Sequence, residues 1–236
     1  MKKPSESYLV AALLSITGGF LDAYTYISRD GVFANAQTGN FARFAICLAN
    51  GDWELVIRYF IPILFFVAGV SVAMWICRHT PQSGKLCWEH YSLLLEIALL
   101  FLVSWIPSSK LCNICANILV SFTCAIQAES FRRVLGTPFS STMCTGNLRT
   151  ASEYLNRFRA EKELSLLQKS LQYFGIDLLF VLGAVIGTFI TKVFQTSATL
   201  CCCVILCAVL QIFFLSFIAL SFSFWYSTSS DSLEIN

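Results

Sequence analysis

The sequence predicts an all-α membrane protein with six transmembrane helices, arranged as two inverted three-helix repeats. Three observations lead to this prediction: a very hydrophobic composition, six long apolar runs, and a Thr-Gly-Asn segment that occurs twice. Hydrophobic residues make up 56% of the 236 residues and charged residues only 13%, which is roughly half the charged fraction of a soluble domain. We therefore expect the lipid bilayer to be the main partner of the chain.

Six segments are apolar enough to cross a bilayer as helices, which takes about 20 residues. They are expected at 8–28, 56–77, 89–106, 111–129, 171–194 and 198–225, followed by a polar tail at 228–236. The first segment is too long for a cleavable signal peptide, and it shows no small-residue cleavage pattern.

Positively charged residues indicate the orientation, because cytoplasmic loops are enriched in Lys and Arg. With the N-terminus inside, eleven of the 16 Lys and Arg residues fall on the cytoplasmic side and four on the opposite side. Most of this excess lies in the connection at 130–170. We therefore expect both termini in the cytoplasm.

An internal repeat is indicated by two Thr-Gly-Asn segments that lie 107 residues apart, at 38–40 and 145–147. The same spacing aligns Asp22 with Glu129, and after an insertion 59–78 aligns with 173–192. Three spans is an odd number, so the second copy enters the membrane from the opposite face. The repeats are expected at 1–106 and 107–227, each with a Thr-Gly-Asn turn followed by a short extra helix, at 41–49 and 148–158.

Inverted repeats are common in secondary transporters, whose substrate sites lie between the repeats near the middle of the membrane. Acids within spans are costly and therefore suggest a function. We expect a proton or ion relay among Asp22, Glu96, Glu129 and Asp177, with Asp22 foremost; a structural hydrogen-bonded acid is the alternative. The expected substrate pathway comprises Gly18, Gly19, Thr38, Gly39, Asn40, Gln127, Arg132, Arg133, Thr145, Gly146, Asn147, Arg149 and Gln211.

The repeated motif itself suggests a binding role. Glycine permits a tight turn, and Thr or Asn can cap the helix that follows. The N-terminus of that helix presents free N–H groups, which suit an anion or a polar group. The alternative is that the motif only shapes the turn, and that Arg132 and Arg133 only follow the positive-inside rule.

Several function classes are disfavoured. The net charge is +2 and no long Lys/Arg block is present, so no nucleic-acid partner is expected. The chain has no metalloprotease, nucleophile-elbow or phosphate-loop motif, so we expect neither an enzyme nor a cofactor. Cys112 and Cys115 form a Cys-x-x-Cys pair without a second pair, so no metal site is expected. The roles of His79 and His90 stay open.

The stretches GGFLDA (18–23), GVFANAQTGN (31–40), QAESFRR (127–133) and TMCTGNLR (142–149) resemble the YoaK-like family of small integral membrane proteins, a domain of unknown function. The resemblance covers nearly the whole chain and implies a bacterial cytoplasmic (inner) membrane protein, without implying a substrate. Where many relatives have Gln-Asn-Ala, this chain has Gln127-Ala128-Glu129.

The sequence therefore favours a transporter of a small polar or anionic solute, for which proton coupling is one option. A channel or uniporter and a non-transporting scaffold are the alternatives. Acids buried within spans favour the coupled carrier, because they are useful to it and costly to a scaffold. A homo-oligomer is compatible with each of these functions.

Overall fold

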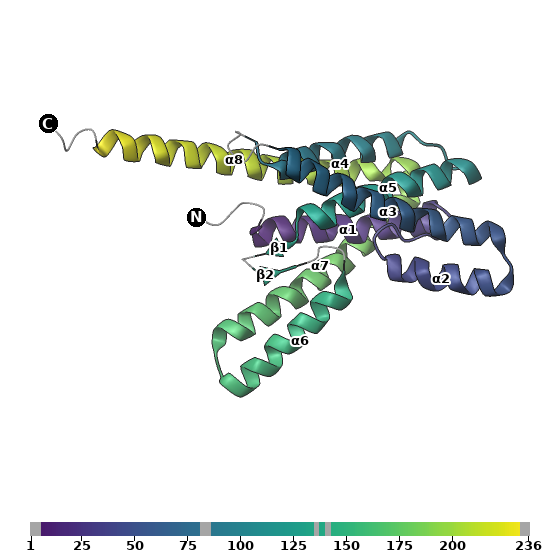
Figure 1. Cartoon of the computed structure of the whole chain (residues 1–236), viewed down its shortest axis with the longest axis horizontal. Helices are drawn as coiled ribbons and strands as arrows, with labels where there is room; N and C mark the ends of the chain where they lie inside the picture. The colour runs from purple at the N-terminus through teal and green to yellow at the C-terminus, as the bar shows by residue number, and fades with distance from the viewer. Residues whose placement is uncertain (1–5, 81–85, 135–136, 140–142, 232–236) are drawn as a thin grey trace.

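The computed structural model describes residues 6–80, 86–134, 137–139 and 143–231, and from residue 216 onward the backbone alone. Long helices form a bundle (Figure 1): α1 (Tyr8–Ser28), α2 (Gln37–Asn50), α3 (Trp53–His79), α4 (Trp88–Ser104), α5 (Lys110–Ser130), α6 (Cys144–Glu161), α7 (Leu164–Phe194) and α8 (Thr199–Asp231). A 3-10 turn, η2 (Gln195–Ala198), separates α7 from α8, and the strands β1 (Arg133–Val134) and β2 (Thr137–Pro138) pair antiparallel. Apart from this strand pair, the predicted all-α fold is confirmed.

Four helical segments in the described part of the chain are long and apolar enough to cross a membrane. They are α1, α3, α5 and the stretch Leu164–Leu215, which contains α7, η2 and part of α8. The helix α4 has 17 residues and is shorter than these. The six predicted runs fall on α1, α3, α4, α5, α7 and α8, although α7 begins earlier than predicted. The helix α8 continues into the predicted polar tail, and 232–236 lie outside the described residues.

Helix α1 packs chiefly against α7, and α3 packs against α5. A glycine permits close approach at each crossing. A Cβ on Gly183 of α7 would overlap the Ile16 carbonyl oxygen of α1, and a Cβ on Gly69 of α3 would lie 2.5 Å from the Phe122 carbonyl oxygen of α5. Small residues that let two backbones touch are typical of helix packing in membranes.

The short helices α2 and α6 each pack against the long helix that follows, α3 and α7 respectively. Gly51 ends α2 with a φ of 76°, a backbone conformation that favours glycine. Lys162 ends α6 with a φ of 58°. In Figure 1 the hairpin of α6 and the start of α7 projects away from the bundle.

The two Thr-Gly-Asn segments were predicted to form turns before helices, and this prediction is wrong. Both segments lie in the first turn of a helix, because α2 and α6 begin four residues earlier than expected. Neither Gly39 nor Gly146 has a positive φ, and among the described residues no side chain caps either helix by a hydrogen bond. In the first copy, the Asn40 side chain accepts a hydrogen bond from the Phe33 N–H and donates one to the Phe33 carbonyl at 2.6 Å. This contact closes the loop before the helix, so the motif belongs to the helix and not to the turn.

Arg29 joins the end of α1 to the connection between α4 and α5. Its guanidinium is fully buried and donates hydrogen bonds to the carbonyls of Ile106 at 2.8 Å and Pro107 at 3.0 Å, and to Asn113 Oδ1 at 3.0 Å. Asn117 of α5 donates to the Arg29 carbonyl at 2.8 Å. The guanidinium therefore lies beyond the C-terminal end of α4, where a positive charge is favourable and carbonyls need donors.

Candidate functional site

A cavity of about 780 Å³ opens between α1, α2, α3, α6 and α7, and we call it the Asp22 cavity. Aromatic and aliphatic side chains form most of its wall, including Tyr26, Phe33, Phe41, Phe66 and Phe180. Its polar lining consists of Asp22, Asn35, Gln37, Thr38, Thr145 and Thr188. A mostly apolar wall with a few polar groups is typical of sites that bind small molecules.

Both Thr-Gly-Asn segments reach the Asp22 cavity. Thr38 lines it from the first turn of α2, and Thr145 and Gly146 line it from the first turn of α6. The first N–H groups of a helix have no partner within the helix, and the N-terminus carries a partial positive charge. Two helix N-termini from distant parts of the sequence therefore border one cavity, an arrangement that suits a polar or anionic group.

Asp22 is buried, with 6% of its surface exposed. Its Oδ1 accepts a hydrogen bond from the Asn35 backbone N–H at 2.7 Å, and the Asn35 side chain donates to the Gly18 carbonyl at 3.0 Å. The loop between α1 and α2 therefore folds back along α1 and is fixed there by the carboxylate. This geometry is compatible with both roles predicted for Asp22, a relay and a structural hydrogen-bonded acid.

Asp177 fixes the start of α6 in a similar way. The buried Asn147 donates to Asp177 Oδ1 at 3.0 Å, and Cys144 also hydrogen-bonds to this acid. Burial and the neighbouring Asp177 raise the pKa of the Cys144 thiol to about 12. Cys144 lines the Asp22 cavity, so a protonated thiol lies at its edge.

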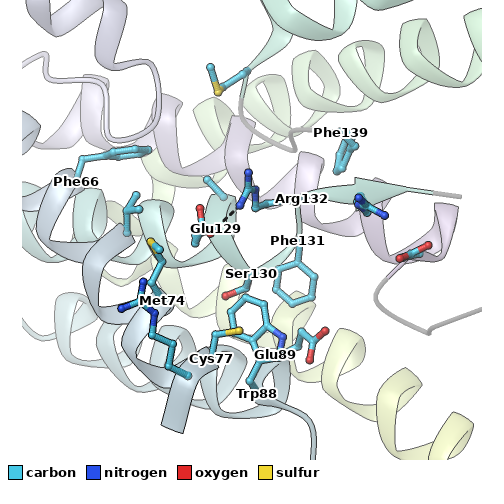
Figure 2. A pocket seen from close by; sticks show the side chains of 16 residues that line it. Phe66, Met74, Cys77, Trp88, Glu89, Glu129, Ser130, Phe131, Arg132 and Phe139 are labelled. Carbon is cyan, nitrogen blue, oxygen red and sulfur yellow. Dashed lines mark hydrogen bonds and ion pairs between the residues drawn. The ribbon is translucent and has the colours of Figure 1, made fainter. Parts of the chain in front are cut away.

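A second cavity of about 820 Å³ is lined by Arg78, Arg132 and Arg133 together with Glu6, Glu89 and Glu129, and we call it the arginine cavity. Figure 2 shows Glu129 paired with Arg132, and the distance between Nη1 and Oε1 is 3.1 Å. Glu129 therefore does not share a cavity with Asp22, its aligned counterpart. Phe66 and Met143 line both cavities.

Four further predicted residues belong to neither lining. Glu96 of α4 is fully buried, and neither carboxyl oxygen has a hydrogen-bond partner among the described residues. Gln127 of α5 donates to the Leu14 carbonyl of α1 at 3.1 Å, which ties these helices together. Arg149 lies exposed on α6 and pairs with Glu153, and Gln211 is exposed on α8.

Apart from Gly146, which lines the Asp22 cavity, the predicted glycines and asparagines lie beside this cavity and support its walls. The Gly18 carbonyl holds Asn35, and a Cβ on Gly19 would overlap the Phe180 carbonyl oxygen. A Cβ on Gly39 would lie 3.1 Å from the Phe33 ring. These residues shape the site without lining it, as Asn40 and Asn147 do through their hydrogen bonds.

Reasoning from the sequence missed Asn35, Phe66 and Arg78. Asn35 lies within the 31–40 stretch that carries the family resemblance, and this was the one signal for it. Phe66 lies within an apolar span, and its one signal in the sequence was the repeat alignment, which pairs it with Phe180. Among the residues that the structure describes, no group of three His, Cys, Asp or Glu side chains is placed to hold a metal ion.

The chain was also compared with known proteins. No curated protein and no solved structure matches it. A family model described as "Protein of unknown function (DUF1275)" matches residues 10–212, which is most of the chain. The chain therefore belongs to the DUF1275 family of proteins of unknown function.

Proposed function

We propose that the chain is an integral membrane carrier of six spans, built from two inverted repeats, that binds a small polar or anionic solute in the Asp22 cavity. One observation carries this proposal. Two Thr-Gly-Asn segments that lie 107 residues apart line the same cavity, together with a buried acid. Substrate sites of carriers with inverted repeats lie between the repeats and are bordered by helix N-termini.

The packing supports the two repeats. Helix α1 of the first repeat packs on α7 of the second, and α5 of the second packs on α3 of the first. The crossing glycines, Gly69 and Gly183, are aligned with each other in the predicted repeat, and each contacts the opposite repeat. Such reciprocal contacts are expected when two similar halves are related by a twofold axis.

The chemistry of the cavity favours an anion or a polar solute. The first-turn N–H groups of Gln37, Gly39 and Gly146 already donate to backbone carbonyls. The donors for a solute are therefore the N–H groups and hydroxyls of Thr38 and Thr145. Asp22 is the acid among the lining residues, and its negative charge opposes an anion. Protonation of Asp22 would remove this repulsion, so binding of an anion and binding of a proton favour each other. Coupling to a proton gradient follows from this linkage.

The proposed carrier is located in a membrane. We place the chain in the bacterial cytoplasmic membrane with both termini in the cytoplasm, on the basis of its apolar helices and the distribution of Lys and Arg. The proposal assigns no enzymatic activity, no cofactor and no nucleic-acid partner to the chain.

Reconstitution of the purified protein tests the carrier function. Solutes would be screened by thermal shift and by solid-supported-membrane currents, with Asp22→Asn beside the wild type. Asparagine keeps an Oδ1 that can accept the Asn35 N–H, so the variant removes the charge and retains this hydrogen bond. A solute that stabilises the wild type should drive a pH-dependent current that is lost in Asp22→Asn.

Glu153→Gln is the matched control, because it neutralises an exposed acid on α6 away from the cavity. It should transport like the wild type. If a broad screen gives neither stabilisation nor current with well-folded protein, the carrier function is wrong. If Asp22→Asn transports like the wild type with the same pH dependence, the proton coupling at Asp22 is wrong and a uniporter is favoured.

A further inference from the structure

Two side chains line both cavities, Phe66 of α3 and Met143 at the N-cap of α6. The arginine cavity and the Asp22 cavity therefore adjoin each other at these two residues. Figure 2 shows Phe66 at one border of the arginine cavity, at the far end from Trp88 and Glu89. Phe66 is half-buried and packs against the main hydrophobic core, which holds the ring in place.

The two cavities differ in charge. The lining of the arginine cavity has three guanidinium groups and three carboxyl groups, and in the described part of the chain only Arg132 and Glu129 of these form an ion pair. The lining of the Asp22 cavity has a single charged residue, Asp22 itself. A solute that enters through the arginine cavity would thus meet charged groups of both signs first and the two helix N-termini second.

We propose that the two cavities are consecutive compartments of one route to Asp22, and that Phe66, together with Met143, is the partition between them. That the two cavities form a route for a solute rests on the proposed carrier function. The partition itself is a property of the fold and can be tested without any solute. A phenylalanine ring has no hydrogen-bond donor, and a thioether sulfur is only a weak acceptor, so neither binds a polar solute strongly. Their displacement would therefore open a direct passage between the two cavities.

The chain contains a native thiol in each compartment. Cys77 lines the arginine cavity and Cys144 lines the Asp22 cavity. Protein in lipid nanodiscs would be treated at pH 9 with the anionic reagent sulfonatoethyl methanethiosulfonate, and the extent of modification at each cysteine followed by peptide mass spectrometry. In Phe66→Ala, Cys144 should be modified several-fold faster than in the wild type, whereas the rate at Cys77 should not change.

Phe180→Ala is the matched control, because Phe180 lines the Asp22 cavity and not the arginine cavity. It enlarges the same cavity without opening the partition, so its Cys144 rate should stay near that of the wild type. Phe66→Trp retains a large ring, and it should slow the modification of Cys144; this variant provides the readout if Phe66→Ala does not fold.

An unchanged Cys144 rate in a folded Phe66→Ala protein would overturn the partition, as would an equal increase in Phe180→Ala. Either result would mean that the reagent reaches the Asp22 cavity by another way. Because no solute takes part in the labelling, a failed transport screen leaves this result intact. Active transport with unchanged labelling would contradict the partition alone.

Discussion

Arg29 has the largest fully buried side chain in the described part of the protein. Its charge is balanced by the carbonyls at the end of α4, by Asn113 of α5 and by Tyr24, whose hydroxyl accepts from Nε at 2.9 Å. A buried charge is tolerated only when such partners surround it. This one residue therefore holds α1, α4 and α5 together.

Replacement of Arg29 by methionine should destabilise the protein strongly. The variant keeps an apolar side chain of similar length but leaves the carbonyls of Ile106 and Pro107 without their donor. Each buried acceptor that loses its partner costs about 1–3 kcal/mol, so we expect the free energy of unfolding to fall by at least about 2 kcal/mol. Denaturant titration in detergent, followed by tryptophan fluorescence, measures this change.

Arg149→Met is the control for this substitution, since the Arg149 side chain is exposed and makes only a surface pair with Glu153. It should leave the unfolding midpoint unchanged. An Arg29→Met protein as stable as Arg149→Met would show that the buried contacts contribute nothing to stability.

The thiol of Cys144 should react slowly and with a steep pH dependence. Burial and Asp177 raise the pKa of Cys144 to about 12, and only the thiolate reacts with alkylating reagents. The rate of alkylation should therefore keep rising with pH up to about 12. In Asp177→Asn the opposing negative charge is gone, so the pKa of Cys144 should fall and its alkylation near pH 8 should become faster.

Peptide mass spectrometry after iodoacetamide treatment can follow Cys144 separately from the other ten cysteines. Asparagine can still accept the hydrogen bond from Asn147, so the start of α6 should keep its structure. Cys77 lines the other cavity and provides the internal control, because its rate should be equal in both proteins. A slower reaction of Cys144 in Asp177→Asn would contradict the effect assigned to Asp177.

Close helix crossings restrict which residues can occupy the contact positions. A Cβ at Gly183 would overlap the Ile16 carbonyl oxygen, so α1 and α7 would have to separate in Gly183→Ala. Overpacking of this kind costs about 1–3 kcal/mol. By contrast, a Cβ at Gly146 would have no atom of the described residues within 4 Å. Gly146→Ala should be neutral or stabilise the protein by up to about 1 kcal/mol, because alanine favours a helix.

Thermal unfolding of the two variants in one detergent provides the comparison. The same result would separate two roles of the Thr-Gly-Asn motif. If Gly146→Ala is stable and the carrier assay shows lost transport, the glycine serves the cavity and not the fold. A large loss of stability in Gly146→Ala, or none in Gly183→Ala, would contradict the packing described for these helices.

The elements differ in how far the sequence could predict them. The apolar runs located α1, α4 and α5 well, because the length of an apolar run reflects the helix itself. The starts of α2 and α6 were misplaced, because contacts from outside the helix set them: Asn40 binds the backbone of Phe33, and Asn147 binds Asp177. No local pattern encodes such contacts. The same reason explains why the partition at Phe66 could not be predicted.

At the scale of the molecule, the proposed repeat would explain why two short helices are present. The hairpin of α2 with α3 and that of α6 with α7 each bring a helix N-terminus to the Asp22 cavity. Their other ends, at Gly51 and Lys162, lie beyond the cavity along α3 and α7. The N-termini of α2 and α6 both border the Asp22 cavity. If the repeats are inverted, the turns at the other ends of these helices must face opposite sides of the membrane.

This arrangement predicts the labelling of two engineered cysteines on opposite faces. Asn50→Cys reports the turn after α2, and Glu163→Cys reports the turn after α6; both positions are exposed. The exposed native cysteines, Cys77, Cys87, Cys115 and Cys207, would first be replaced by serine. A membrane-impermeant maleimide should label Asn50→Cys in right-side-out vesicles only, and Glu163→Cys in inside-out vesicles only.

The assignment of faces follows from charge, since Arg157, Arg159 and Lys162 surround the second turn and favour the cytoplasm. The reverse pattern would keep the inverted repeats and overturn only the orientation. Labelling of both cysteines from the same face would contradict the inversion itself. In that case α2 and α6 would enter the membrane from one side, and the Asp22 cavity could not alternate between the two faces by a symmetric exchange of the repeats.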